Sequence, residues 1–169
     1  MKDAKIRKLV MSSLLAALVF VATMVIRIPS PTGGYVNLGD CFVLLSGWLL
    51  GPWYGAAAAG IGAMLTDLLA GYTYYAPATL IIKAADAMVT ALIWQAMGRK
   101  RGALIVSGIA GELLMTIGYF GFTALLLGKG LGAALSIPGD LVQGATGIVI
   151  GVVLMKLFER SKILEKLAK

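Results

Sequence analysis

Six ionisable side chains lie in or beside apolar stretches long enough to cross a lipid bilayer, and they are the residues best placed for chemistry. Five are among the chain's eight acidic residues and one is a lysine: Asp40, Asp67, Lys83, Asp86, Glu112 and Asp140. A charged group in the middle of a membrane helix costs about 2.5–3.5 kcal/mol, so it usually has a partner or a task. We expect Glu112 near the membrane midplane and the other five in its outer half. This arrangement suggests a one-sided polar cavity that captures a solute from outside.

Asp40 and Asp140 stand where apolar helices are expected to begin. Asp40 follows Gly39 at the start of one helix, and Asp140 lies in the first turn of another. A carboxylate at a helix N-terminus accepts backbone N–H hydrogen bonds and is favoured by the helix dipole. Structural capping and contact with a ligand are therefore both open for these two residues.

Asp67, Lys83 and Asp86 are explained most simply by one another. Asp67 is expected in the last turn of one helix and Lys83 in the second turn of the next, where the helix dipole disfavours each charge. The two residues lie near the same depth, and Asp86 follows Lys83 at i+3 on the same helical face. We therefore predict a mainly structural Asp67–Lys83–Asp86 ion network, with direct ligand binding as the alternative.

Glu112 has no cation within four residues on either side. Thr116 and Tyr119 continue its helical face at i+4 and i+7, and Gln143 follows Asp140 on another helix, so two polar stripes are expected to rise toward the outer mouth. Side chains of the expected outer loops complete the candidate site: Tyr35, Asn37 and Tyr75. Tyrosines in such loops also serve as membrane-interface anchors.

The composition is that of an integral membrane protein. Hydrophobic residues form 59% of the chain, charged residues only 14%, and the mean hydropathy is +0.90, more apolar surface than a soluble domain of 169 residues can bury. The net charge of +7 is concentrated in three basic clusters expected on one face, which the positive-inside rule makes cytoplasmic. It therefore encodes orientation and does not indicate nucleic-acid binding. With no histidine and one cysteine, neither a metal site nor another cofactor is expected.

The apolar stretches predict an all-α integral membrane protein, a single domain over residues 1–169, with six transmembrane helices and both termini in the cytoplasm. The expected helices cover residues 9–26, 40–50, 53–70, 77–97, 103–127 and 137–158. Outer loops rich in proline and glycine, or in tyrosine, follow the first and third helices. No room is left for a soluble catalytic domain, so we do not expect an enzyme.

Small residues recur every four positions on several helices, a spacing that lets membrane helices approach closely. Two overlapping pairs lie on the first helix: Ser12 with Ala16, and Ser13 with Ala17. Contacts within the chain are the ordinary explanation of such pairs. Those on the first helix could equally face another subunit.

Four segments together resemble the substrate-binding S components of energy-coupling factor (ECF) transporters, in the riboflavin-transporter-like group. They are 35–40 (YVNLGD), 50–52 (LGP), 67–72 (DLLAGY) and 75–83 (YAPATLIIK). The resemblance is strong over the first four helices and rests on pattern alone in the last two. It implies a multi-pass protein of a prokaryotic plasma membrane that captures a vitamin from outside.

The resemblance also implies partners. Family members dock through the first helix onto a transmembrane T component that two ATPases drive, and this chain has no GxxxxGK[ST] loop with which to use ATP itself. The family's docking pattern is Ala-x-x-x-Ala, to which Ser12, Ser13, Ala16 and Ala17 correspond only in part.

The substrate is expected to contact residues from the first outer loop and from helices two and four to six: Tyr35, Asn37, Asp40, Tyr75, Lys83, Asp86, Glu112, Thr116, Tyr119, Asp140 and Gln143. Because carboxyl groups outnumber Lys83, a neutral or cationic solute is expected. The resemblance implies vitamin B6 or hydroxymethylpyrimidine, a thiamine precursor, ahead of riboflavin.

The sequence also allows two other functional classes. A proton-coupled secondary transporter could use Glu112 as its carrier carboxyl, but it should show inverted repeats or a helix broken at midplane, and neither is clear. An intramembrane aspartyl enzyme would need two acids at one depth without a nearby cation, and Lys83 argues against it.

Overall fold

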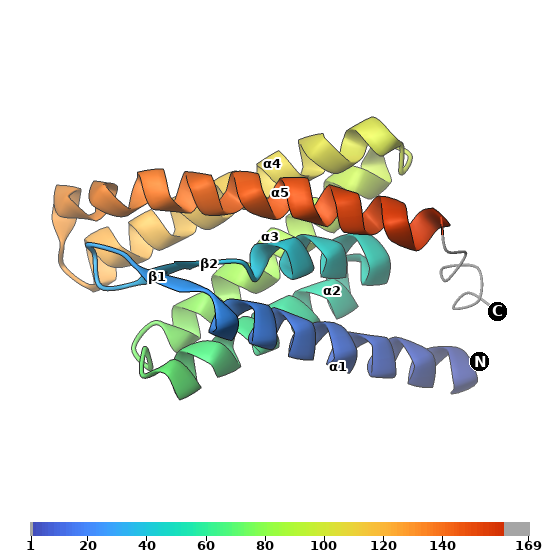
Figure 1. Cartoon of the computed structure of the whole chain (residues 1–169), viewed down its shortest axis with the longest axis horizontal. Helices are drawn as coiled ribbons and strands as arrows, with labels where there is room; N and C mark the ends of the chain where they lie inside the picture. Colours follow the sequence, from blue (N-terminus) through green and yellow to red (C-terminus); the bar gives the residue numbers. More distant parts are fainter. Residues whose placement is uncertain (1, 161–169) are drawn as a thin grey trace.

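The computed structural model describes residues 2–160, which form five helices long and apolar enough to cross a membrane, together with a short β-hairpin (Figure 1). The long helices are α1 (Lys2–Val25), α2 (Asp40–Ala70), α3 (Ala76–Ala96), α4 (Arg101–Gly121) and α5 (Ile137–Arg160). The all-helical class predicted from the sequence is therefore correct. Residues 161–169, with part of the predicted C-terminal basic cluster, lie outside the described residues.

Helix α2 consists of two arms that meet at Gly51 and lie side by side (Figure 1). Gly51 has φ 79° and ψ −176°, a backbone conformation open essentially to glycine alone, and Pro52 has no N–H to continue the helix. The arms pack so closely that a Cβ on Gly55 would lie 2.6 Å from the carbonyl oxygen of Ser46. The predicted segments 40–50 and 53–70 are these two arms.

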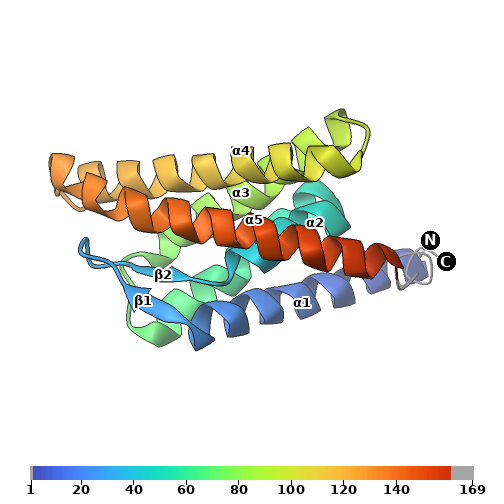
Figure 2. The same ribbon diagram turned by 45° about the horizontal axis from the view of Figure 1, so that its top comes forward.

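The expected loop after α1 contains an antiparallel hairpin. Strand β1 (Arg27–Pro29) pairs with β2 (Tyr35–Asn37), with Arg27 opposite Asn37. Strand β2 contacts both α1 and α5, and the hairpin lies along that side of the bundle (Figure 2). The loop thus contains regular structure, and it packs against helices at one end of the molecule.

The end of α4 departs from a plain helix. It continues as a π-helical turn, η1 (Phe122–Leu126), and a 3₁₀ segment, η2 (Gly130–Ser136), then leads into α5. Within η1, Thr123 is buried and its hydroxyl oxygen lies 3.3 Å from that of Tyr75. Turns of this kind are frequent at functional sites, and the predicted helix 103–127 gave no sign of it.

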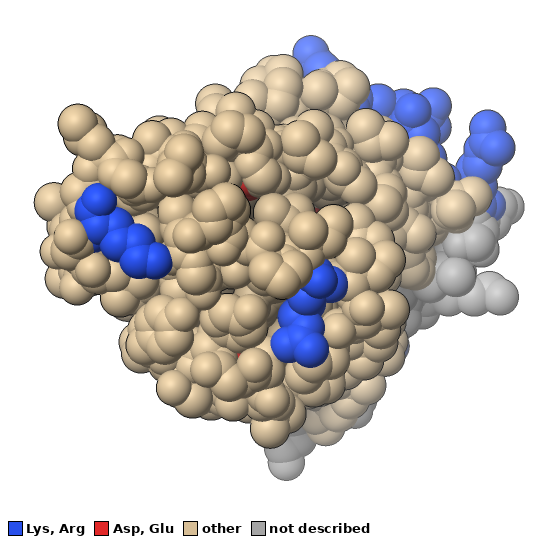
Figure 3. Space-filling view, turned by 60° about the vertical axis from the view of Figure 1, so that its left-hand side comes forward, with Lys and Arg blue, Asp and Glu red and all other residues tan. Residues whose placement is uncertain are grey.

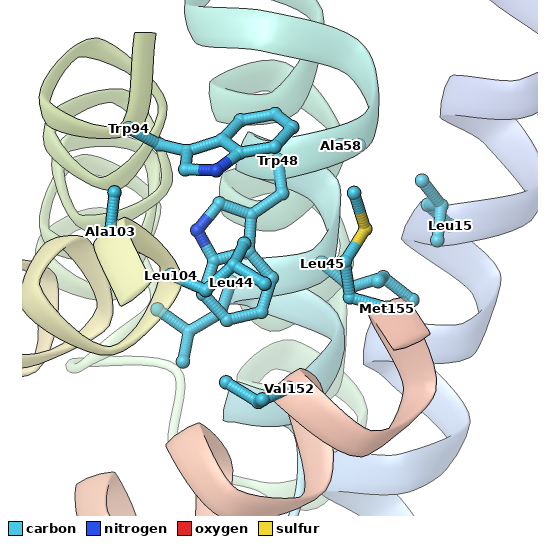
Figure 4. Close-up of a cluster of buried hydrophobic side chains, with 10 residues drawn as sticks. All are labelled: Leu15, Leu44, Leu45, Trp48, Ala58, Trp94, Ala103, Leu104, Val152 and Met155. Atoms are coloured by element: carbon cyan, nitrogen blue, oxygen red, sulfur yellow. The ribbon is translucent and has the colours of Figure 1, made fainter. Parts of the chain in front are cut away.

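One half of the bundle has a solid apolar core (Figure 4). Its buried members are Leu15, Leu44, Leu45, Trp48, Ala58, Trp94, Ala103, Leu104, Val152 and Met155. Most of them lie near the Gly51 reversal, the α3–α4 turn or the end of α5. The one polar atom of the Trp48 ring, Nε1, donates to the Ser107 hydroxyl at 3.0 Å, whereas Nε1 of Trp94 has no hydrogen-bond partner among the described residues.

The acidic side chains lie inside the bundle. Five of them are at most 8% exposed: Asp40, Asp67, Asp86, Glu112 and Asp140. In the space-filling view of the end that carries the hairpin, acidic atoms show only as traces between other side chains (Figure 3). These five acidic groups therefore belong to the interior of the bundle and not to its surface.

Candidate functional site

A polar cavity lies between the β-hairpin and the helix ends in the half of the bundle away from the apolar core. It contains about 610 Å³ of empty space, counted with its open mouth. Eight of the eleven predicted substrate-binding residues line it: Tyr35, Asn37, Asp40, Tyr75, Lys83, Tyr119, Asp140 and Gln143. The fold thus brings together side chains separated by up to about a hundred residues in the sequence.

The central contact in the cavity wall is an ion pair between Lys83 and Asp40. Their side chains are 4% and 1% exposed, so both charges are removed from solvent. The prediction named Asp67 and Asp86 as the partners of Lys83, and this is wrong. Within the part of the chain that the structure describes, Lys83 forms its ion pair with Asp40 alone. The prediction paired Lys83 with Asp67, at the same expected depth on the preceding helix, and with Asp86, one turn away on its own helix. Asp40 instead reaches Lys83 from the start of α2.

Gln143 connects this ion pair to the hairpin. Its side-chain Nε2 donates to Asp40 Oδ2 at 2.6 Å, and its Oε1 accepts the backbone N–H of Asn37 at 2.7 Å. The Asn37 side chain in turn accepts the backbone N–H of Gly39 at 2.7 Å. The Asp40 carboxylate therefore accepts hydrogen bonds from Lys83 and Gln143. These two contacts explain a carboxylate at this position better than helix capping does.

Tyr35 and Asp67 form the second polar contact of the wall. The Tyr35 hydroxyl donates to Asp67 Oδ1 at 2.5 Å, and Asp67 Oδ2 has no hydrogen-bond partner within residues 2–160. Burial, together with the Asp67 carboxylate, raises the pKa of the Tyr35 phenol above its ordinary value, so this hydroxyl stays neutral and donates. Asp67 lines the cavity instead of joining an ion network.

Two tyrosines form an aromatic side of the cavity. The rings of Tyr75 and Tyr119 have centroids 6.4 Å apart, and the Tyr119 hydroxyl donates to Thr79 Oγ1 at 3.1 Å. The ammonium nitrogen of Lys83 lies 5.7 Å from the Tyr119 ring centroid, within the range of a cation–π contact. The site can thus offer both a flat apolar surface and hydrogen-bonding groups to a small aromatic solute.

Three predicted residues lie outside this cavity. Asp86 is fully buried, and the Thr90 hydroxyl donates to it at 3.4 Å. Glu112 and Thr116 line a separate groove between α4 and α5, which Asp140 also borders. Both carboxyl oxygens of Glu112 lack a hydrogen-bond partner in the described part of the chain.

Sequence reasoning did not name several hydroxyl side chains that line the cavity. They are Thr23, Ser30, Thr32, Thr79 and Ser136. Thr79 could have been found, because it precedes Lys83 by four residues and so shares its helical face. Thr23 had no such signal, because it belongs to an apolar helix and reaches the cavity only through the packing of α1. Within residues 2–160 no group of three or more metal-ligating side chains is placed to hold an ion.

The two small-residue pairs of α1 have different surroundings. Ser12 and Ala16 are partly buried, and a Cβ on Gly62 of α2 would lie 2.4 Å from the Ala16 carbonyl oxygen. Ser13 and Ala17 are exposed. Ser12 and Ala16 therefore border a close contact within the chain. Ser13 and Ala17 form an exposed strip of small side chains on the surface of the bundle.

The chain is similar to known proteins in family, in sequence and in fold. A family model described as the S component of the ECF-type riboflavin transporter matches residues 3–160. An uncharacterised protein of Pyrococcus woesei is 36% identical over 135 residues, which cover 79% of this chain and 88% of that protein. The thiamine precursor transporter HmpT of Lactococcus lactis subsp. cremoris (strain MG1363) is 29% identical over 174 residues, which cover 100% of this chain and 98% of HmpT.

A solved structure has the same fold. It is described as the S component of a bacterial ECF transporter, and it matches with a TM-score of 0.65 over 96% of this chain and 99% of that chain. At 22% sequence identity this likeness concerns the fold.

Proposed function

The chain belongs to the family of ECF-type riboflavin transporter S components, and from that premise we propose that it captures hydroxymethylpyrimidine, a thiamine precursor, from outside the cell. Because the family and its relatives are transport proteins, the chain is a component of a membrane transporter and not an enzyme. The intramembrane aspartyl enzyme considered above is thereby excluded.

The one-sided cavity is the observation that carries the proposal. Its polar walls lie at the hairpin end of the bundle, and the apolar core fills the other half. Such a subunit can hold a solute but offers it no continuous path across the membrane. Release on the inner side requires reorientation of the whole subunit, driven by partners that hydrolyse ATP.

The proposed orientation places the cavity on the outside. The basic run Arg99 to Arg101 belongs to the α3–α4 turn, at the same end of the bundle as the start of α1 and the end of α5 (Figure 1). Positive charge flanking membrane helices favours the cytoplasmic side. With the two arms of α2 counted separately, the chain has six membrane segments and both ends inside, in the plasma membrane of a prokaryotic cell.

The ligand assignment rests on the cavity and on one relative. HmpT, which is a thiamine precursor transporter by its description, aligns over the whole of this chain. The Tyr75 and Tyr119 rings suit a small aromatic ring, and the cavity's only lining cation, among the described residues, is already paired with Asp40. A neutral or cationic compound such as hydroxymethylpyrimidine fits this lining better than an anion; vitamin B6 is the next candidate and riboflavin comes after it.

The proposed partners are a T component and two ATPases. The exposed strip at Ser13 and Ala17 is the surface of α1 that we propose for the T component, because small residues permit close approach of a membrane helix. Ser12 and Ala16 belong to the contact with α2 and are less available to a partner.

Titration calorimetry on the purified chain tests the proposal. We expect saturable binding of one hydroxymethylpyrimidine per chain in detergent, with no partner present. Vesicles that contain only this chain should show no uptake under a proton gradient. Uptake by those vesicles would instead support the proton-coupled transporter that uses Glu112.

A further inference from the structure

Two carboxyl oxygens of the cavity residues are buried and have no hydrogen-bond partner in the described chain. They are Oδ2 of Asp67 and Oδ2 of Asp140. The residues are 3% and 8% exposed, and both line the cavity, Asp67 from the end of α2 and Asp140 from the first turn of α5. A buried acceptor left without a donor destabilises the protein, and more so if the acceptor is charged. Both oxygens are therefore suited to receive hydrogen bonds from a bound solute.

The nearby cations do not supply those hydrogen bonds. Lys83 forms its ion pair with Asp40. At the hairpin end, Lys129 donates to the Thr32 carbonyl, and the Arg27 guanidinium lies 5.9 Å from the centre of the Tyr35 ring. Neither of these two cations is among the residues that line the cavity. The lining thus contains three carboxyl groups and one ammonium group.

The position of Asp67 in its helix is a second reason why its negative charge is poorly compensated. It lies in the last turn of α2, where the backbone N–H groups of Gly71 and Tyr72 bond to its carbonyl oxygen. Negative charge is disfavoured at a helix C-terminus, and here the hydroxyl groups of Thr79 and Tyr35 and the positive charge of Lys83 offset it in part. Because Oδ2 has no hydrogen-bond partner among the described residues and Asp67 lines the cavity, this oxygen can accept a hydrogen bond from a bound solute.

We propose that Asp67 and Asp140 bind the substrate through two of its N–H or O–H groups, and that they exclude its phosphate esters. This inference rests on the proposed function and specifies its substrate class. Hydroxymethylpyrimidine has an amino group and a hydroxymethyl group, which are two such donors on one ring. Its phosphate ester replaces the hydroxyl donor with a dianion, which the uncompensated carboxylates repel.

Titration of the full-length chain with matched pairs of compounds tests the inference. The probes are hydroxymethylpyrimidine with its phosphate ester, and pyridoxine with pyridoxine 5′-phosphate. The free alcohol should bind at least about 100-fold more tightly than its ester. In Asp67→Asn and in Asp140→Asn the alcohol should bind about 10- to 100-fold more weakly, the loss of one hydrogen bond to a charged group. Binding of the ester should not weaken, so the ratio of the two affinities falls.

Glu159→Gln is the matched control, because Glu159 pairs with Arg101 away from the cavity, and both affinities should stay as in the original chain. Equal weakening of alcohol and ester in the aspartate variants would show a merely structural role and overturn the inference. If either variant fails to fold, the alcohol-to-ester ratio of the unaltered chain still decides the question.

The outcomes separate the inference from the proposed function. Equal or tighter binding of an ester overturns the inference and leaves the vitamin transporter in place. Binding of pyridoxine alone, with the same preference over its ester, supports the inference and replaces the proposed ligand. Failure of all four compounds to bind overturns both.

Discussion

Lys83 of α3 and Asp40 of α2 form an ion pair in the cavity wall, although 43 positions separate them in the sequence. Both side chains are almost completely buried. The pair ties the start of α2 to α3, and Gln143 extends the contact to α5 and the hairpin. Lys83 is thus paired with Asp40, and Asp67 Oδ2 has no hydrogen-bond partner among the described residues.

Replacing Lys83 by methionine should destabilise the protein even without ligand. Removing one member of a buried ion pair leaves an uncompensated charge, at a cost of about 3–5 kcal/mol. The melting temperature of Lys83→Met in detergent should therefore fall clearly. Arg101→Gln, which breaks the exposed pair with Glu159, should change it little. An unaltered melting temperature with lost binding would make Lys83 a ligand contact instead of a structural one.

Gly39→Ala should impair both folding and ligand binding. A Cβ at this position would lie 2.0 Å from Thr23 Oγ1 and 2.9 Å from Asn37 Oδ1, so α1 or the hairpin has to move away from the cavity. Overpacking of this kind costs about 1–3 kcal/mol. Gly102→Ala is the control, because nothing lies within 4 Å of the added atom. Thermal unfolding and calorimetry measure the two effects, and equal behaviour of both variants would refute the close packing at Gly39.

Glu112→Gln should have little effect on ligand affinity, less than about threefold. The sequence suggested a ligand contact, but the structure places Glu112 in the groove between α4 and α5, outside the main cavity. The substitution keeps the shape and removes a buried acid without hydrogen-bond partners, so stability should not fall. A loss of about 1.5–3 kcal/mol in binding, the value of a hydrogen bond to a charged group, would restore Glu112 to the binding site.

Leucine substitutions on α1 should distinguish the surface of the helix from its internal contact. Ala17→Leu adds bulk to an exposed position, so the isolated chain should fold and bind normally while uptake by cells with the complete transporter is lost. Ala16→Leu enlarges a partly buried residue beside Gly62 and should lower the melting temperature as well. Normal uptake with Ala17→Leu would rule out this strip as the docking surface.

The general architecture could be predicted from the sequence because hydropathy and charge act over long stretches of chain. The apolar runs identified the long helices, and Gly51-Pro52 marked the reversal within α2. The π-helical turn at Phe122–Leu126 could not be foreseen, because its residues resemble any apolar helix and the turn follows from contacts such as Thr123 with Tyr75.

The site was predictable in part for a related reason. Polar residues inside apolar stretches are few, so eight of the eleven that were named do line the cavity. Their partners were harder to predict, because Asp40 and Lys83 meet only through the packing of α2 on α3. Equal depth suggested Asp67 for Lys83 and the i+3 spacing suggested Asp86. Neither depth nor local spacing tells which distant helix packs closest to Lys83.

Calorimetric titration of the purified, partner-free chain with hydroxymethylpyrimidine tests the central claim most directly. We expect saturable binding of one molecule per chain, strongly weakened in Asp67→Asn and unaltered in Glu159→Gln. Absence of binding would refute the proposed ligand, and equal binding by Asp67→Asn and the original chain would refute the role of Asp67.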